Sequence, residues 1–259
     1  MIRDELLEEP VSVDDRGPFP LTGATTSVRC KDGTEVHRPL AMLRADQVLA
    51  GKPWRVVRSR RGQRHFSGLY WSATTSGHVV YESRLELARL LLADFDPTVV
   101  AIAAQPFRIH ARVDGRLRRH VPDFLLVYED GSVTVVNVKP TSKLSDPKIV
   151  EALSWPAQLI EGHGWAHEIW TGEGQETLLA NVRFLAAARR PELVSAEAES
   201  KVLSALVPGD TVRTLTFRLA GVLAPDQVKP VVLSLLWRHR LTTDMGRVVD
   251  EDSVLRGAA

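Results

Sequence analysis

Residues 120–140 constrain the fold more than any other part of this sequence, because they read as a β-hairpin with polar residues at unexpected positions. The stretch is HVPDFLLVYEDGSVTVVNVKP, in which two apolar runs flank the dipeptide Asp130-Gly131. An Asp-Gly pair between alternating apolar residues is a strong local signal for a hairpin turn. At the strand ends farthest from that turn stand three polar residues, Asp123, Asn137 and Lys139. They either lie on a solvated face or converge on one point.

The length of the turn decides between these two interpretations. A two-residue turn places Asp123 opposite Val138 and directs it away from Asn137. A three-residue loop that begins at Glu129 places Asp123 opposite Asn137 instead, so that all three polar side chains share one face. This loop type needs a left-handed residue at its last position, and Gly131 stands there. A mostly apolar face that ends in a carboxylate and an ammonium favours the convergent site, since burying unpaired charges is costly.

The neighbouring residues predict an α/β domain. Apolar residues at helical spacing indicate a helix over 81–94, and β-branched residues predict a strand over 98–112 that bends at Pro106. The pattern also predicts strands at 121–128 and 133–139, a helix at 146–162, a strand at 166–171 and a helix at 175–189. Residues 1–51 are predicted to form an N-terminal arm, partly disordered because residues 1–27 show no sustained periodicity.

The C-terminal residues 195–259 carry a different pattern, three amphipathic helices followed by a predicted two-stranded wing. The predicted helices cover 196–206, 211–220 and 225–240, and the wing is predicted to turn at Met245-Gly246. Three helices and a wing indicate a winged helix-turn-helix domain. Eight Lys and Arg balance eight Asp and Glu in this part, so a role in protein docking is at least as well supported as DNA binding.

Two basic segments flank the hairpin in the sequence. Residues 52–64 contain no acidic residue, and the second segment leads into Asp123 with Asp114 as its counter-charge. Either segment is a solvated charged loop or a surface for nucleic-acid phosphates. The arginines that we expect to contact DNA are Arg55, Arg58, Arg60, Arg61, Arg64, Arg118 and Arg119.

The bulk properties exclude several classes of protein. The net charge of +1 neither requires nor excludes a polyanionic partner. Cys30 is the single cysteine, which excludes an internal disulfide framework and a thiolate-rich zinc site. The acidic N-terminus lacks the features of a signal peptide, and no apolar run approaches the ~18–20 residues that span a bilayer. We therefore expect a soluble cytoplasmic protein with no membrane partner.

The hairpin motifs resemble a known nuclease signature. VPD followed across the hairpin by NVK resembles the PD-(D/E)XK motif, and the predicted order resembles the αβββαβ core of restriction-endonuclease-like folds. YESRLELARLLLADFDPTVVAIAAQPFRI, followed by the hairpin, is similar to the N-terminal endonuclease domain of TnsA transposition proteins over roughly residues 53–140, and more weakly to about 170. The resemblance implies an endonuclease domain at 52–190 followed by the winged helix-turn-helix domain.

The resemblance also implies a metal site. Glu86 and Asp123 match the metal-binding carboxylates of the family, Lys139 matches its catalytic lysine, and the carbonyl of Val138 is the implied third protein ligand. Asn137 stands where the family usually has Gln, Glu or Asp. The implied cofactor is Mg²⁺, for which Mn²⁺ is expected to substitute. Glu82, one helical turn before Glu86 on the same face, is the alternative carboxylate.

The function implied by the family is Mg²⁺-dependent DNA cleavage within a heteromeric transposase. Such a subunit cuts the 5′ ends of a transposable element in a bacterial nucleoid, beside a DDE-type transposase, while an ATPase regulator docks on the C-terminal domain. Two alternatives remain open. One is a stand-alone nuclease of a restriction, repair or phage system, and the other is an inactive nuclease fold that serves as a DNA-binding assembly adaptor.

Overall fold

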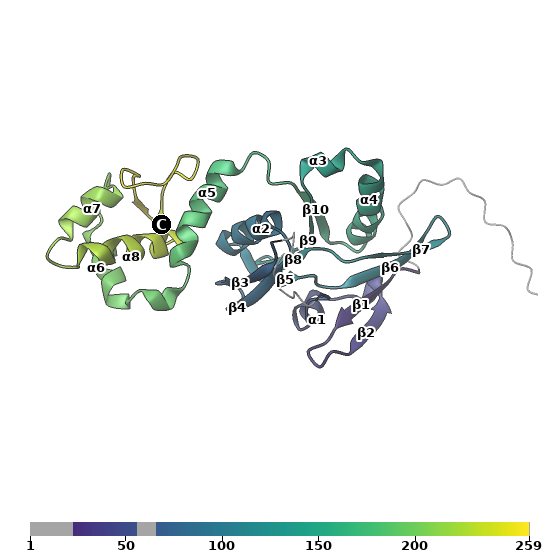
Figure 1. Ribbon diagram of the computed structural model, residues 1–259. Coiled ribbons are helices and arrows are strands. Elements are labelled where there is room, and N and C mark those ends of the chain that lie inside the picture. Colours follow the sequence, from purple (N-terminus) through teal and green to yellow (C-terminus); the bar gives the residue numbers. More distant parts are fainter. Residues whose placement is uncertain (1–22, 56–65, 259) are drawn as a thin grey trace, which may run out of the picture.

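The computed structural model describes residues 23–55 and 66–258, and its centre is a four-stranded sheet in the order β10-β9-β8-β5 (Figure 1). β8 is antiparallel to both β5 and β9, whereas β10 runs parallel to β9. The strands are β5 (Val99–Ala104), β8 (Phe124–Tyr128), β9 (Val133–Val138) and β10 (Ala166–Trp170). The associated helices are α2 (Arg84–Phe95), α3 (Thr141–Leu144), α4 (Pro147–Gly162) and α5 (Glu176–Leu185). The predicted order α-β-β-β-α-β is therefore confirmed by α2, β5, β8, β9, α4 and β10.

Both faces of this sheet are apolar because alternate residues of its strands enter different core clusters. Val136 and Leu126 belong to a cluster that includes residues of α2 and α5. Val135 and Leu125 belong to a second cluster, which includes residues of α4 such as Ile160. The period-2 alternation of the two apolar runs is thus explained by helices packed on both sides.

The β8–β9 hairpin has the three-residue loop. Leu125 pairs with Val135 and Val127 with Val133, so the two strands are in the register that places Asp123 opposite Asn137. The amide of Gly131 donates to the carbonyl of Tyr128 at 3.0 Å, and Gly131 has a φ of +83°. The predicted loop and its left-handed glycine are therefore confirmed.

A second sheet lies beside the first, in the order β2-β1-β6-β7. Its strands are β1 (Thr25–Arg29), β2 (Glu35–Pro39), β6 (Arg108–Val113) and β7 (Arg116–His120). The prediction of one bent strand over 98–112 is wrong, because β5 and β6 belong to different sheets. Between them Gln105 has a left-handed φ of +46°, and Pro106 has no backbone N–H for a ladder, so the chain leaves the central sheet there.

The N-terminal residues are part of the second sheet from Thr25 onward. β1 pairs with both β2 and β6, and the 3-10 helix η1 (Leu40–Met42) and α1 (Ala45–Leu49) follow. Val28 and Leu40 are buried in the same cluster as Ile109 of β6. The structure thus differs from the predicted arm over 1–51, since residues 25–51 are built into the fold by strand pairing with a distant segment. Residues 1–22 lie outside the described residues.

An additional hairpin, which the sequence pattern did not predict, is held on α2 by a buried carboxylate. Its strands are β3 (Gly68–Ser72) and β4 (Gly77–Tyr81). Asp94 of α2 is 5% exposed and accepts hydrogen bonds from the hydroxyls of Tyr70 (2.7 Å) and Ser72 (2.5 Å). It also accepts from the backbone amides of Ala73 (3.0 Å) and Thr74 (2.8 Å). With four donors the buried charge is satisfied, so Asp94 has a structural role.

The three predicted C-terminal helices are confirmed, and the predicted wing is wrong. The helices are α6 (Ala196–Ala205), α7 (Val212–Arg218) and α8 (Pro225–Trp237), preceded by the 3-10 helices η2 (Ala186–Ala188) and η3 (Pro191–Leu193). The short strand β11 (Leu241–Thr242) pairs with β12 (Arg256–Gly257), so the segment between them is a long loop that does not reverse into a second strand after Met245-Gly246.

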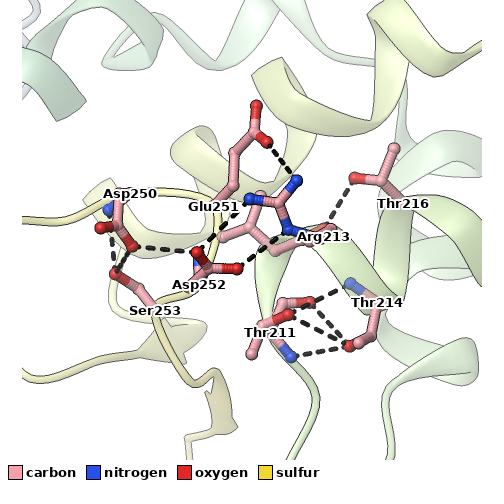
Figure 2. A network of polar contacts seen from close by, with 9 residues as sticks. Thr211, Arg213, Thr214, Thr216, Asp250, Glu251, Asp252 and Ser253 are labelled. Atoms are coloured by element: carbon pink, nitrogen blue, oxygen red, sulfur yellow. Dashed lines mark hydrogen bonds and ion pairs between the residues drawn. The ribbon is translucent and has the colours of Figure 1, made fainter.

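Side chains of neighbouring helices hold this loop. The Asn181 side chain of α5 donates to the carbonyls of Met245 (3.0 Å) and Arg247 (2.7 Å) and accepts from the amide of Val249 (2.9 Å). On the other side, Arg213 in the first turn of α7 pairs with Glu251 and Asp252 (Figure 2). The Asn181 contacts satisfy backbone groups that a regular wing would pair within its own ladder. Among the described helices, none is long and apolar enough to cross a membrane.

The loop of the β8–β9 hairpin gives a stability test. Gly131→Ala is expected to destabilise the protein by about 1–2 kcal/mol, because an alanine side chain disfavours the left-handed conformation. A side chain there meets no other atom within 4 Å, so backbone conformation alone causes the loss. Urea unfolding measures it. Gly131→Asn is the matched control and is expected to lose less, since asparagine adopts this conformation more readily. Equal losses for both variants would contradict the prediction.

Candidate active site at the open end of the hairpin

The β8–β9 ladder ends at Asp123, and this ending creates the site. The amide of Asp123 donates to the carbonyl of Val136 at 3.0 Å. The residues before Asp123 lie outside this ladder, because the chain comes from β7 of the second sheet. On the other edge of β9 the amide of Lys139 donates to the carbonyl of Trp170. Since peptide groups alternate along a strand, the N–H and C=O of Val138 point to the vacated side. Side chains satisfy both: Asp123 Oδ2 accepts from the Val138 N–H at 2.7 Å, and Lys139 Nζ donates to the Val138 carbonyl at 3.0 Å.

Asp123 and Lys139 therefore meet at the backbone of one residue, Val138, where each bonds to one of two successive peptide groups. Lys139 Nζ lies 3.7 Å from Asp123 Oδ2, and the side chains are 36% and 18% exposed respectively. Burial raises the pKa of Asp123, and this effect outweighs the lowering by the Lys139 charge and the Val138 N–H. The negative charge of Asp123 is thus only partly compensated by the described residues around it.

Glu86 stands in the first turn of α2, where it also caps the helix. Ser83 is the N-cap, and its hydroxyl accepts from the Glu86 amide at 3.1 Å. The Glu86 carboxylate in turn accepts from the Ser83 hydroxyl at 3.0 Å and from the Glu82 amide at 2.7 Å. This is a variant of the capping box, in which the Glu86 carboxylate reaches the backbone amide of the residue before the N-cap. Burial raises the pKa of Glu86, and the negative charges of Asp123 and Glu82 raise it further, so these carboxylates lie within electrostatic reach of one another.

Glu82 differs from Glu86 in its partner. Glu82 forms an ion pair with Arg55, whereas no ion pair of Glu86 is found in the described part of the chain. A carboxylate that already has a cation gains less from a second one, and a buried carboxylate with neutral donors gains more. The arrangement therefore favours Glu86 over Glu82 as the second acidic group facing Asp123.

Asn137 does not join Asp123 and Lys139, although the loop length that was to bring them together is the observed one. Its side chain is 1% exposed and lies between two imidazoles. The Nε2 atom of His120 is 2.9 Å from Asn137 Oδ1, and the Nε2 atom of His167 is 2.8 Å from Asn137 Nδ2. Burial lowers the pKa of His120 to about 4, so this imidazole is neutral at neutral pH. Of the three polar side chains predicted to converge, Asp123 and Lys139 do so and Asn137 does not.

The two histidines were not anticipated as partners of Asn137, because they come from β7 and β10. Nothing in their spacing along the chain indicates that these strands bring them to one amide. The Gln105 side chain hydrogen-bonds to a neighbouring loop, since its Oε1 accepts from the Arg55 amide at 2.7 Å. The Gln105 amide donates to the Asp123 carbonyl at 2.8 Å, so this left-handed residue links the site to residue 55.

The predicted DNA-contacting arginines occupy different surroundings. Arg55 pairs with Glu82 and lowers the pKa of Asp123 by its charge, so it lies beside the site. Arg118 pairs with Glu151 and, at 3.6 Å, with Asp114. Arg119 is exposed on the opposite face of β7. The predictions that lie outside the described residues are Arg58, Arg60, Arg61 and Arg64.

Oxygen atoms are the potential ligands at this site. Within residues 23–55 and 66–258, no three side chains of His, Cys, Asp or Glu are grouped closely enough to hold a metal ion. The donors that face the opening are the carboxylates of Asp123 and Glu86 and the Val138 carbonyl. A set of few carboxylates and one peptide oxygen suits a hard divalent cation that keeps several of its waters, and it suits zinc poorly.

The comparison with protein families adds an independent finding. Residues 96–172 match a family model described as TnsA-like endonuclease N terminal. The matched segment contains Asp123, Val138 and Lys139 and the whole β8–β9 hairpin, whereas Glu86 on α2 lies before it. The comparison with curated proteins found no match. The resemblance to TnsA-like proteins is therefore confirmed for the segment that forms the centre of the site.

The raised pKa of Asp123 predicts a pH-dependent cost of stability. A carboxyl whose pKa is higher in the folded than in the unfolded state favours folding when protonated, and that contribution is lost as the pH rises through the folded pKa. In chelator-treated protein, Asp123→Asn is therefore expected to raise the urea midpoint at pH 7.5, with a smaller gain at pH 4.5. A loss of stability of equal size at both pH values would argue against an uncompensated charge at this position.

Asp130 provides a control of opposite sign. It lies in the hairpin loop, where hydrogen bonds from Ser132 lower its pKa. A lowered pKa contributes stability above the unfolded pKa, so Asp130→Asn is expected to reduce the midpoint at pH 7.5 and to have less effect at pH 4.5.

Proposed function

We propose that this chain, which carries a TnsA-like endonuclease N-terminal domain over residues 96–172, is a Mg²⁺-dependent DNA endonuclease that cuts the 5′ ends of a transposable element. The observation that carries the proposal is the pairing of Asp123 and Lys139 at the backbone N–H and C=O of Val138, inside the matched segment. The αβββαβ order of the central sheet and its helices agrees with a restriction-endonuclease-like core.

The cation is proposed to be held by Asp123, Glu86 and the Val138 carbonyl. When bound, Mg²⁺ supplies positive charge that polarises the scissile phosphate and favours ionisation of a coordinated water. The residues fit this task because both carboxyl groups are partly buried, have raised pKa values and receive only partial compensation from their neighbours. Mn²⁺ is expected to substitute.

Lys139 is proposed to act on the reacting phosphate. In hydrolysis the oxygen of a water forms a new bond to phosphorus and its proton passes to solvent, while one P–O bond of the diester breaks. The sugar oxygen that leaves keeps the electron pair of that bond and takes up a proton from solvent. The negative charge on the phosphate oxygens grows in the transition state, and an ammonium stabilises it most where water is excluded. The Lys139 ammonium, now donating to the Val138 carbonyl, is placed to turn toward such an oxygen.

Asn137 is proposed to position the end of β9 rather than to bind the cation. Its amide is engaged by His120 and His167, and it carries no charge. The site therefore has one carboxylate fewer than a nuclease with an acidic residue at this position. That difference is the observation that favours the adaptor alternative, an inactive nuclease fold that binds DNA and assembles a complex.

The remaining assignments concern partners. We propose a DDE-type transposase subunit that cuts the complementary strand, and an ATPase regulator that docks on helices α6 to α8, which together with β11 and β12 would form a variant winged helix-turn-helix. The support is the TnsA-like match and the near-neutral charge of this part, which suits protein docking. Cleavage of bare DNA without partners would favour the stand-alone nuclease instead.

Strand cleavage tests the catalytic assignment. Asp123→Ala and Lys139→Ala are each expected to reduce 5′-end cleavage at least ~100-fold, the loss typical for removal of one group that stabilises transition-state charge. The assay follows labelled element ends with the partner transposase and Mg²⁺, and circular dichroism checks folding. Lys143→Ala, at an exposed lysine of α3, is the matched control and is expected to cut normally. Cleavage by Lys139→Ala at the wild-type rate would refute the assignment.

Cation-linked stability separates the nuclease from the adaptor without an activity assay. Mn²⁺ at 100 times its Kd is expected to stabilise the wild type by about 2.7 kcal/mol, or roughly 5–10 °C in Tm for a chain of this size. Glu86→Gln retains the capping box but loses the charge, so most of the shift is expected to disappear. Glu82→Gln is the matched control and is expected to keep the Mn²⁺-induced shift in Tm. A shift that survives Glu86→Gln and Asp123→Asn, or no shift in the wild type, supports the adaptor.

A further inference from the structure

The second sheet has one face that is rich in arginine, referred to below as the outer face. Ser27 of β1 lies opposite both His37 and Arg108, and His110 lies opposite Arg119. Because paired residues share a face and alternate residues of one strand return to it, the rows combine into a single surface. The basic residues of the outer face are Arg29, His37, Arg108, His110, Arg112 and Arg119.

The opposite face of the same sheet is apolar along β6 and also carries Arg38, Arg116 and Arg118. Ile109, Ala111 and Val113 alternate with the outer-face residues of β6 and are buried. Arg118, which shares their side of the sheet, has acidic partners in Glu151 and Asp114. By contrast, within the described residues no ion pair to a carboxylate involves any of the four outer-face arginines.

The contacts of these arginines with the described residues leave their charges available. The Arg108 guanidinium lies over the Trp54 ring, 4.0 Å from its centroid, and Arg29 donates to the Trp54 carbonyl at 3.4 Å. Arg112 reaches only the Gly115 carbonyl, also at 3.4 Å. A cation–π contact or a carbonyl holds a guanidinium in place without neutralising it.

His110 reports the positive field on this surface. Burial lowers its pKa first, and the charges of Arg108, Arg119 and His37 lower it further, against a weaker opposing effect of Glu35. Its Nε2 and the Nδ1 of His37 both contact the buried Ser27 hydroxyl, at 3.0 and 2.7 Å. Like charges are thus held close together on ordered strands, which is an unfavourable arrangement unless a polyanion binds there.

The outer face leads to the candidate active site. Arg108 begins β6, and the Trp54 on which it stacks donates its amide to the Gln105 carbonyl at 3.3 Å. Gln105 in turn contacts both the Arg55 amide and the Asp123 carbonyl. From Arg108 the cations continue along β6 to Arg112, over ~13 Å of strand. Figure 1 shows the β6–β7 hairpin projecting away from the central sheet, so this row extends outward from the site.

We propose that the outer face binds the phosphate backbone of duplex DNA beside the scissile phosphate. This inference rests on the proposed nuclease function, because it assigns a path to the DNA that the site would cut. A row ~13 Å long matches about four base-pair steps of a duplex. Arginine suits the task because its planar guanidinium binds phosphate oxygens bidentately, and contacts of this kind orient the duplex without reading its sequence.

Salt-dependent DNA binding tests the proposal. The probe is a labelled duplex of about 30 base pairs that carries an element end, titrated with the full chain in chelator so that no cleavage occurs. Each phosphate contact contributes about −0.9 to the slope of log K against log salt. Arg112→Gln combined with Arg119→Gln is expected to weaken binding and to reduce the slope by roughly 1.8. Circular dichroism confirms folding.

Arg116→Gln is the matched control. Arg116 is an exposed arginine of the same hairpin, but it pairs with Val113 and therefore lies on the other face. The wild-type slope is expected for this variant. An unchanged slope in the double variant overturns the proposal, and so does an equal loss per arginine in Arg116→Gln, which would reflect net charge alone.

The outcome for the surface can be separated from the outcome for the nuclease. If the double variant loses binding while Asp123→Ala and Lys139→Ala still cleave, the surface stands and the proposed catalytic function fails. If those variants lose cleavage while the double variant binds with the wild-type slope, the catalytic function stands and the surface proposal is overturned.

Discussion

The end of the β8–β9 ladder at Asp123 is the constraint on which the site depends. Buried backbone groups must be paired, and here the N–H and C=O of Val138 lose their strand partner because the chain leaves for the second sheet. A carboxylate and an ammonium take over the two hydrogen bonds. The groups to which we assign chemistry are therefore also the ones that complete the sheet, which explains how they are held in a defined orientation without a loop of their own.

The negative charges at the end of the β8–β9 ladder are only partly compensated by positive charges. Asp123 has the Lys139 ammonium at 3.7 Å, Glu82 has Arg55, and Glu86 has neutral donors at the start of α2. Burial raises the pKa values of both Asp123 and Glu86 despite these partners. The folded chain thus holds carboxylates together at a cost in stability, which the proposed cation would offset. The arginine-rich outer face is also uncompensated, but its charge is positive. Its arginines lie along a strand that starts beside the site, and we propose an anionic partner for them.

The accuracy of the sequence predictions followed the range of the interactions involved. The predictions of the helices and of the hairpin loop were correct. The helices follow from local apolar periodicity, and the loop follows from the burial of both faces of β9, which is encoded in adjacent residues. The predictions of a bent strand over 98–112, of an N-terminal arm that includes residues 25–51 and of a wing were wrong. Each of these segments depends on a partner segment far away in the sequence. Two of the three Asp-Gly dipeptides illustrate the limit: at 114–115 the pair forms the two-residue turn between β6 and β7, whereas at 130–131 it completes a three-residue loop.

The sequence by itself determined that Asp123 and Lys139 lie at the same end of one hairpin, because side-chain alternation and a left-handed Gly131 leave one register in which the apolar residues share faces. Only the tertiary structure decided what surrounds them. Asn137 meets His120 and His167 instead of the site, and Arg55 is brought to Glu82 through Gln105. These contacts join segments whose proximity depends on how the two sheets and the parallel strand β10 assemble, and no local pattern of residues specifies that assembly.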